Sequence, residues 1–163
     1  MGDGIVYFRL KQAMDQYDTV MRISDGGGLK GVLHIHLLDS ALEFIQNDEY
    51  YPEFRHKLTH LVFTVSNTHC FTDGNKRTSI ALGAYFLTIN GYEHLVPRFI
   101  VEMENVVLWV AANLVPKELL LAIITDIVEL GELSEETQLE LVDMLERYER
   151  MIESSGLNNP NES

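Results

Sequence analysis

The stretch from Asn75 to Gly91 reads NKRTSIALGAYFLTING and is the strongest structural signal in the chain. Its interior, TSIALGAYFLTI, is apolar on almost every side of a helix. Such a helix belongs inside a bundle and not on its surface. Asparagine followed by glycine is a typical C-terminal stop. The stretch therefore predicts a buried central helix that begins at Asn75 or Lys76 and ends at Asn90-Gly91.

Helical periodicity continues on both sides of this stretch. The glycine run at 26–28 is the clearest break, and 46–52 reads as an exposed loop. Further helices are expected at 6–23, 37–45, from 53 onward, and at 99–114, 116–130 and 134–154. The sequence predicts an all-α fold, a single-domain helical bundle over 1–155 around the buried helix, followed by a flexible tail at 156–163.

Composition and charge limit the function classes. The 163 residues suit one domain, and 46% of them are hydrophobic, which is enough for a core. Residues 1–101 carry 11 acids and 9 bases, whereas residues 102–163 carry 14 acids and 3 bases. A surface of this sign repels duplex DNA, so we expect no nucleic-acid partner. The apolar runs are shorter than the roughly 20 residues needed to cross a bilayer, so no membrane partner is expected either.

The number of cysteines indicates the redox state of the cellular compartment that suits the chain. Cys70 is the only cysteine of the chain, so no internal disulfide can form. A chain without disulfides suits a reducing compartment. We therefore expect a cytoplasmic protein.

The segment His69–Arg77, HCFTDGNKR, does not have the composition of ordinary packing. It lies between two apolar helices and ends inside the first turn of the buried one. Backbone N–H groups of Gly74 and Asn75, at the start of that helix, should be unpaired and suited to an anion. The side chains of Lys76 and Arg77 can neutralise phosphate oxygens. The segment therefore predicts a phosphate-binding site.

Two further side chains of this segment suit phosphoryl chemistry. Asp73 offers a hard oxygen ligand for Mg²⁺, an ion that proteins often hold through one or two carboxylates together with phosphates. His69 can accept a proton at neutral pH, as a general base that activates a hydroxyl must do. Phe71 is expected to anchor the segment to the core.

At these residues the chain resembles the Fic/Doc family, whose motif has a histidine, a phenylalanine two residues on, an acid two further, and then Gly-Asn-Gly-Arg or Ala-Asn-Lys-Arg. The form HCFTDGNKR is most similar to the Doc (death-on-curing) toxin branch because Lys76 replaces the second glycine. The resemblance covers about Gly26 to Tyr92, including the glycine-rich turn before Leu38-Asp39-Ser40-Ala41-Leu42.

The resemblance implies a role for each motif residue. His69 is the expected general base on a Ser, Thr or Tyr hydroxyl of a target protein, and Asp73 is the expected ligand of Mg²⁺. Gly74, Asn75, Lys76 and Arg77 are the residues expected to form the anion hole. The loop at 44–53 is the expected flap that clamps an extended target segment by main-chain pairing, with Asn47, Tyr50 and Tyr51 in it. For the two tyrosines, covering the core is an equal alternative.

The resemblance also implies substrates and partners. Family members transfer AMP or, in Doc, a phosphate from ATP onto elongation factor Tu. Lys76 and Ile80, the latter in place of a second arginine, favour phosphate transfer from ATP, whereas Gly74 follows the AMP-transferring form. The expected protein is thus a Doc-like transferase, a toxin restrained by an antitoxin. AMP transfer and a non-catalytic nucleotide- or partner-binding module stay open, as does a homo-oligomer formed through the helix at 134–154.

Overall fold

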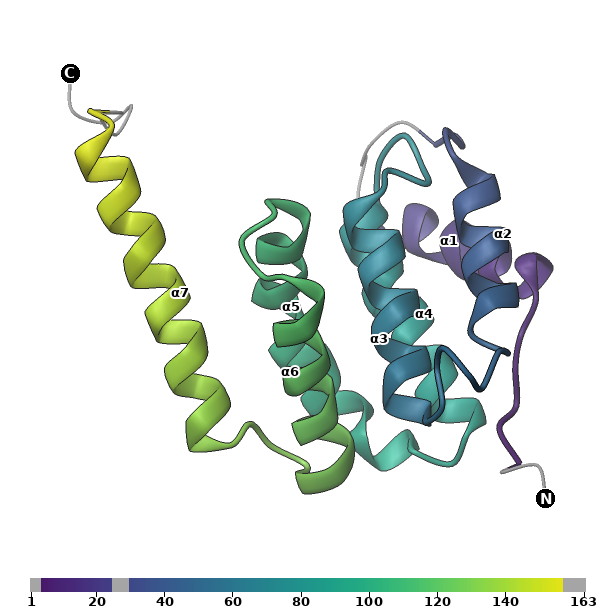
Figure 1. The fold of residues 1–163 in the computed structure, drawn as a ribbon. Coiled ribbons are helices and arrows are strands. Elements are labelled where there is room, and N and C mark those ends of the chain that lie inside the picture. The colour runs from purple at the N-terminus through teal and green to yellow at the C-terminus, as the bar shows by residue number, and fades with distance from the viewer. Residues whose placement is uncertain (1–3, 25–29, 157–163) are drawn as a thin grey trace.

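The computed structural model describes residues 4–24 and 30–156, which form a bundle of helices (Figure 1). Its elements are α1 Leu10–Ile23, α2 Ile35–Phe44, α3 Phe54–Asn67, α4 Asn75–Ile89, η1 Glu93–Leu95, α5 Val96–Ala111, α6 Lys117–Leu130 and α7 Glu135–Ser154. No strand is present in these two ranges, so the prediction of an all-α fold is confirmed. The expected glycine-rich turn at 26–28 and the tail beyond Gly156 lie outside the described residues.

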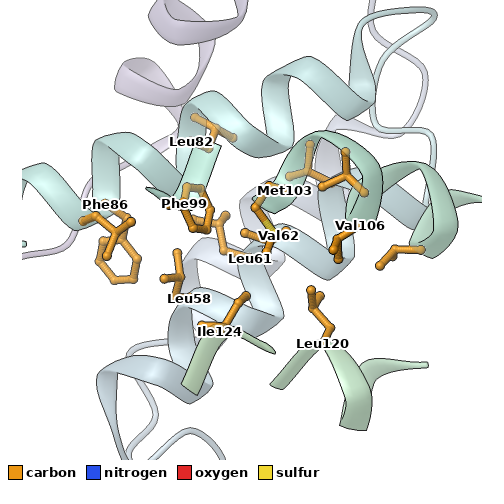
Figure 2. Close-up of a cluster of buried hydrophobic side chains, with 14 of the residues drawn as sticks. Leu58, Leu61, Val62, Leu82, Phe86, Phe99, Met103, Val106, Leu120 and Ile124 are labelled. Atoms are coloured by element: carbon orange, nitrogen blue, oxygen red, sulfur yellow. The ribbon is translucent and has the colours of Figure 1, made fainter. Parts of the chain in front are cut away.

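The core is built around α3 and α4 together. Buried side chains from α3, α4, α5 and α6 meet in one cluster, among them Leu61, Leu82, Phe99 and Ile124 (Figure 2). The helix α3 contacts α2, α4, α5 and α6, and buried residues run along its whole length. Two neighbouring central helices therefore replace the single buried helix that the apolar stretch at 78–89 suggests.

Close packing of α4 against α5 depends on Gly83. A Cβ atom at this position would lie 2.5 Å from Cζ of Phe99 and 3.2 Å from Cγ2 of Val62. Such distances are too short for a side chain, so glycine leaves room for the Phe99 ring of α5 against α4.

Some helix boundaries differ from the sequence-based expectation. Residues 4–9 are not helical, and in this segment Phe8 is buried and packs edge-on against Tyr85 and Phe86. The helix α5 begins at Val96, with a proline in its first turn, and ends at Ala111, shortly before Asn113 turns to φ +61°. Because residues 6–9 are not helical, α1 begins at Leu10 and is shorter than the helix expected at 6–23.

The helix α7 leads away from the rest of the bundle (Figure 1). Its N-cap Ser134 accepts a hydrogen bond from the backbone N–H of Thr137 and donates its hydroxyl to Asp126 Oδ2 at 2.8 Å. Ser134 thereby caps α7 and ties the start of this helix to α6. None of the helices in the described ranges is both long and apolar enough to cross a membrane.

Candidate active site

A cavity of about 300 Å³ opens at the N-terminal end of α4. All six predicted residues of the motif line it, together with Ser66, Thr72 and Ala111; they are His69, Asp73, Gly74, Asn75, Lys76 and Arg77. The end of α3, the start of α4 and the end of α5 thus contribute to one wall. A possible base, a carboxylate and two cations therefore lie at the same cavity.

The segment before α4 is anchored by Phe71. Its side chain is fully buried and stacks on the ring of Tyr17, with centroids 3.9 Å apart and planes 6° apart. The Asn75 side chain accepts a hydrogen bond from the Phe71 N–H and donates one to the Phe71 carbonyl, both at 2.9 Å. The Asn75 amide therefore holds the backbone of the segment in place, a positioning role that the sequence did not reveal.

The His69 side chain is exposed on the cavity wall, and its neighbour Cys70 is fully buried. The backbone of His69 has φ +49°, in the left-handed region that residues other than glycine rarely adopt. A conformation of this kind costs free energy and is retained where the surroundings enforce it. Here it allows position 69 to face the cavity while position 70 enters the core.

The N-terminus of α4 presents donors to the cavity. The N-cap Gly74 has φ +80°, and its N–H donates to Asp73 Oδ1 at 2.7 Å. The expectation that this N–H is unpaired is therefore wrong. The backbone N–H groups of Asn75, Lys76 and Arg77 have no acceptor within the described ranges. These three amides, at the positive end of the helix dipole, can receive an anion.

The two cations of the motif are exposed. One guanidinium nitrogen of Arg77 donates to the hydroxyl of Ser24 at the end of α1, which holds the side chain beside the cavity. For Lys76, the structure gives no carboxylate partner in the described part of the chain. Both positive charges are therefore available to phosphate oxygens.

A short backbone strip, Gly31 to His34, lies against the motif and was not predicted as part of the site. Val32 forms an isolated antiparallel bridge with Phe71. The Thr72 N–H donates to the Gly31 carbonyl at 2.9 Å, and the N–H groups of residues 33 and 34 donate to the Cys70 carbonyl. The glycine-rich composition upstream was the only signal in the sequence for an irregular segment here.

The predicted flap at 44–53 does not reach the cavity. It precedes α3 and the motif follows α3, so the two lie at opposite ends of a 14-residue helix, which is about 20 Å long. Fully buried Lys57 pins this loop through hydrogen bonds of 2.7 Å to the Ile45 carbonyl and to Asp48. The structure therefore places the loop at 44–53 away from the motif, with α3 between the two.

The three residues named for the flap have other contacts. Asn47 accepts the Glu49 N–H within its own turn. The ring of Tyr51 packs on His60, and Tyr50 is 75% exposed. Tyr51 thus lies against α3 in this structure.

The donor set at the cavity is compatible with Mg²⁺ held partly by a nucleotide. Asp73 is an exposed carboxylate on the cavity wall, and one of its oxygens already accepts the Gly74 N–H. Within the described ranges no cluster of three or more His, Cys, Asp or Glu residues could hold a metal alone. One carboxylate together with phosphate oxygens is a common arrangement for Mg²⁺.

Comparison with known proteins agrees with the motif. The model of the Fic/DOC family matches residues 8–87, a range that includes α1, the strip at 31–34 and the whole motif. Among curated proteins and among solved structures, no match is found. The helices α5, α6 and α7 lie outside the matched range.

Proposed function

Because residues 8–87 have the pattern of the Fic/DOC family, whose members are typically nucleotide-dependent transferases, we propose that the chain transfers a phosphate from ATP to a protein hydroxyl. The target residue is a serine, threonine or tyrosine. The proposed biological role is that of a Doc-like toxin acting on a translation factor such as elongation factor Tu, with an antitoxin as its restraint.

One observation carries the proposal. Exposed His69 and the unpaired amides at the start of α4 line the same cavity of about 300 Å³. A general base and an anion-binding helix end must lie this close if an incoming hydroxyl is to meet a bound phosphate. The exposed charges of Lys76 and Arg77 add the positive potential that a nucleotide requires.

The proposed step uses the residues of the cavity as follows. His69 takes the proton of the target hydroxyl while its oxygen attacks the γ-phosphorus of ATP. The bond between this phosphorus and the bridging oxygen breaks, and ADP leaves. Lys76, Arg77 and the amides of α4 stabilise the charge on the phosphate oxygens. Asp73 would hold Mg²⁺, which neutralises phosphate charge when bound.

Position 80 supports a terminal phosphate as the transferred group. Ile80 is only partly buried and packs against the core, so the second turn of α4 provides no second cation here. AMP transfer, in which the α-phosphate is attacked, remains the alternative reaction. Gly74 favours that alternative, because it matches the AMP-transferring form of the motif.

The strip at 31–34 is the proposed place for the target segment. It lies directly beside the motif, and the side chains of Val32 and Leu33 are 49% and 56% exposed. An extended segment could align there by main-chain pairing and bring its hydroxyl to His69. This strip takes the role first expected of the loop at 44–53.

Labelled ATP tests the proposal. The purified chain is incubated with Mg²⁺, a translation factor and ATP labelled at either the γ- or the α-phosphate. Label from the γ-phosphate on the translation factor supports phosphate transfer, and His69→Ala should abolish it. His94→Ala is the matched control, because this exposed histidine lies in η1, away from the cavity. Label from the α-phosphate alone would establish AMP transfer instead.

A binding module is the second candidate function, favoured by the mixed form of the motif and by the acidic C-terminal third. It predicts nucleotide binding without transfer of either label. The same growth arrest on expression of the wild-type chain and of His69→Ala would support it. Growth arrest that requires His69 would support the transferase.

A further inference from the structure

The helix α7 has little contact with the rest of the chain. Of its 20 residues only Thr137 and Leu141 are buried, and both lie in its first half. Towards its C-terminal end α7 leads away from α5 and α6 (Figure 1). An isolated helix of this length is marginal in water, and most helices gain their stability by packing an apolar face.

The sequence of α7 has an apolar face along its whole length. Apolar residues recur at helical spacing from the middle of the helix to its end; they are Leu141, Met144, Leu145, Tyr148, Met151 and Ile152. Met151 is 67% exposed although it continues the stripe that begins at the buried Leu141. The apolar face is therefore longer than the surface that this chain buries.

A groove of about 750 Å³ runs between this face and α6. Met144, Tyr148 and Met151 line one side, and Leu114, Leu119 and Ala122 line the other. The lining of α7 extends from Glu140 to Met151, which corresponds to about 16 Å of helix. This length matches about three turns of a second helix laid alongside.

Acidic side chains border the groove. Glu118, Glu140 and Asp143 all contribute to its lining. The one arginine of the lining, Arg147, is paired with Asp143 at 2.6 Å. We propose that this groove binds a basic amphipathic helix of another protein, with its apolar face on α6 and α7 and its Lys and Arg side chains on the acidic border.

The charge of α7 argues against a second copy of this chain as the occupant. The helix carries seven acids and two bases, so two such helices packed together would bring like charges into contact. The negative electrostatic field of α7 stabilises a bound basic helix and also attracts that helix before contact. In helix-in-groove binding of this kind, the bound helix inserts apolar side chains at i, i+3, i+4 and i+7 spacing into the groove.

Two labelled synthetic peptides of about 15 residues test the proposal. Both have leucines at i, i+3, i+4 and i+7 spacing, and their polar face is lysine in one and glutamate in the other. Fluorescence anisotropy with the full chain should show binding of the lysine peptide at least about tenfold tighter than that of the glutamate peptide. The affinity should decrease with added salt, since the border charges are exposed.

Two variants of α7 form a matched pair. Met151→Asp places a charge in the groove and should weaken binding of the lysine peptide at least about tenfold. Leu139→Asp makes the same change at a residue that is 62% exposed and outside the lining, so binding should be unchanged. Hydrogen exchange should show new protection in the second half of α7 when the peptide binds.

Three results would overturn the proposal: equal affinity for the two peptides, equal effects of the two variants, or unchanged exchange in α7. Sedimentation equilibrium tests whether a second copy of this chain occupies the groove. If the chain is a dimer that Met151→Asp converts to a monomer, a second copy fills the groove and the proposal is wrong. None of these measurements uses ATP, so they are independent of the proposed transfer reaction.

Discussion

The Asn75 side chain forms a reciprocal pair of 2.9 Å hydrogen bonds with the backbone of Phe71. The other end of α4 repeats this arrangement, because Asn90 accepts the Val6 N–H at 2.8 Å and donates to the Val6 carbonyl at 3.0 Å. An asparagine at each end of the helix thus fixes an extended segment of backbone. Only the pair at Asn75 borders the candidate active site.

Asn75→Asp should destabilise the chain and lower transfer. The carboxylate keeps the acceptor for the Phe71 N–H but leaves the Phe71 carbonyl without its donor, at a cost of about 1–3 kcal/mol. Urea denaturation measures this loss. Asn90→Asp is the control, since it should cost a similar free energy while transfer by the folded protein is unchanged. Equal loss of transfer in both variants would contradict a local role for Asn75.

Tyr17→Phe should loosen the strip at 31–34 while the motif stays packed. The Tyr17 hydroxyl accepts the Gly31 N–H at 2.9 Å and donates to the Gly31 carbonyl at 3.3 Å. Phenylalanine retains the stacking on Phe71 but leaves the Gly31 N–H without its acceptor, whereas the Gly31 carbonyl keeps the hydrogen bond from the Thr72 N–H. We expect a loss of about 1–3 kcal/mol in the free energy of unfolding. Faster hydrogen exchange at 31–34 checks the location of the effect, and unchanged exchange there would count against it.

Gly74→Ala should destabilise the start of α4 for two reasons. The position has φ +80°, and a Cβ atom would lie 2.7 Å from the sulfur of Met21. The left-handed backbone alone costs an alanine roughly 1–2 kcal/mol. Thermal unfolding of Gly74→Ala, Met21→Ala and the double variant separates the backbone cost from the steric contact with Met21. Met21→Ala should remove the steric part of the loss, and strict additivity of the two losses would show that no steric part exists.

The stability of the chain should fall as the pH decreases from 6.5 towards 4 because of His60. Burial and the nearby positive charge of Lys117 lower the pKa of His60 from 6.5 to about 4. The unfolded state then binds more protons than the folded state in this range, so the free energy of unfolding rises with pH. The ring also holds Lys117, whose Nζ lies 2.7 Å from His60 Nδ1.

His60→Gln should reduce this slope. Urea denaturation at pH 6.5 and pH 5 compares the variant with wild type in a range where carboxylates contribute less. His56→Gln is a control on the same helix, because burial also lowers the pKa of His56 but Lys117 does not contribute to that shift. An equal slope in His60→Gln and wild type would show that His60 is not the group responsible.

Much of the fold was predictable because the signals are local. The apolar stretch from 78 to 89 and the stop at Asn90-Gly91 each act within a few residues, and both appear where expected. The chemistry of the segment His69–Arg77 is equally local. Its residues share one cavity because they are consecutive around the start of α4.

Most features that escaped prediction depend on contacts between distant segments. The sequence predicts a helix between the loop at 44–53 and the motif, but it does not indicate that the strip at 31–34 would lie against the motif. The pairing of Gly31 with Thr72 and Tyr17 crosses long stretches of chain and has no periodic signature.

Local propensity and hydrophobic periodicity therefore account for the helices and for the reactive segment, since both are written into neighbouring residues. Packing of remote segments placed the strip at 31–34 beside the motif and left the second half of α7 without a buried residue. Those outcomes depend on which surfaces fill the core together, and short-range sequence patterns carry no information about that choice.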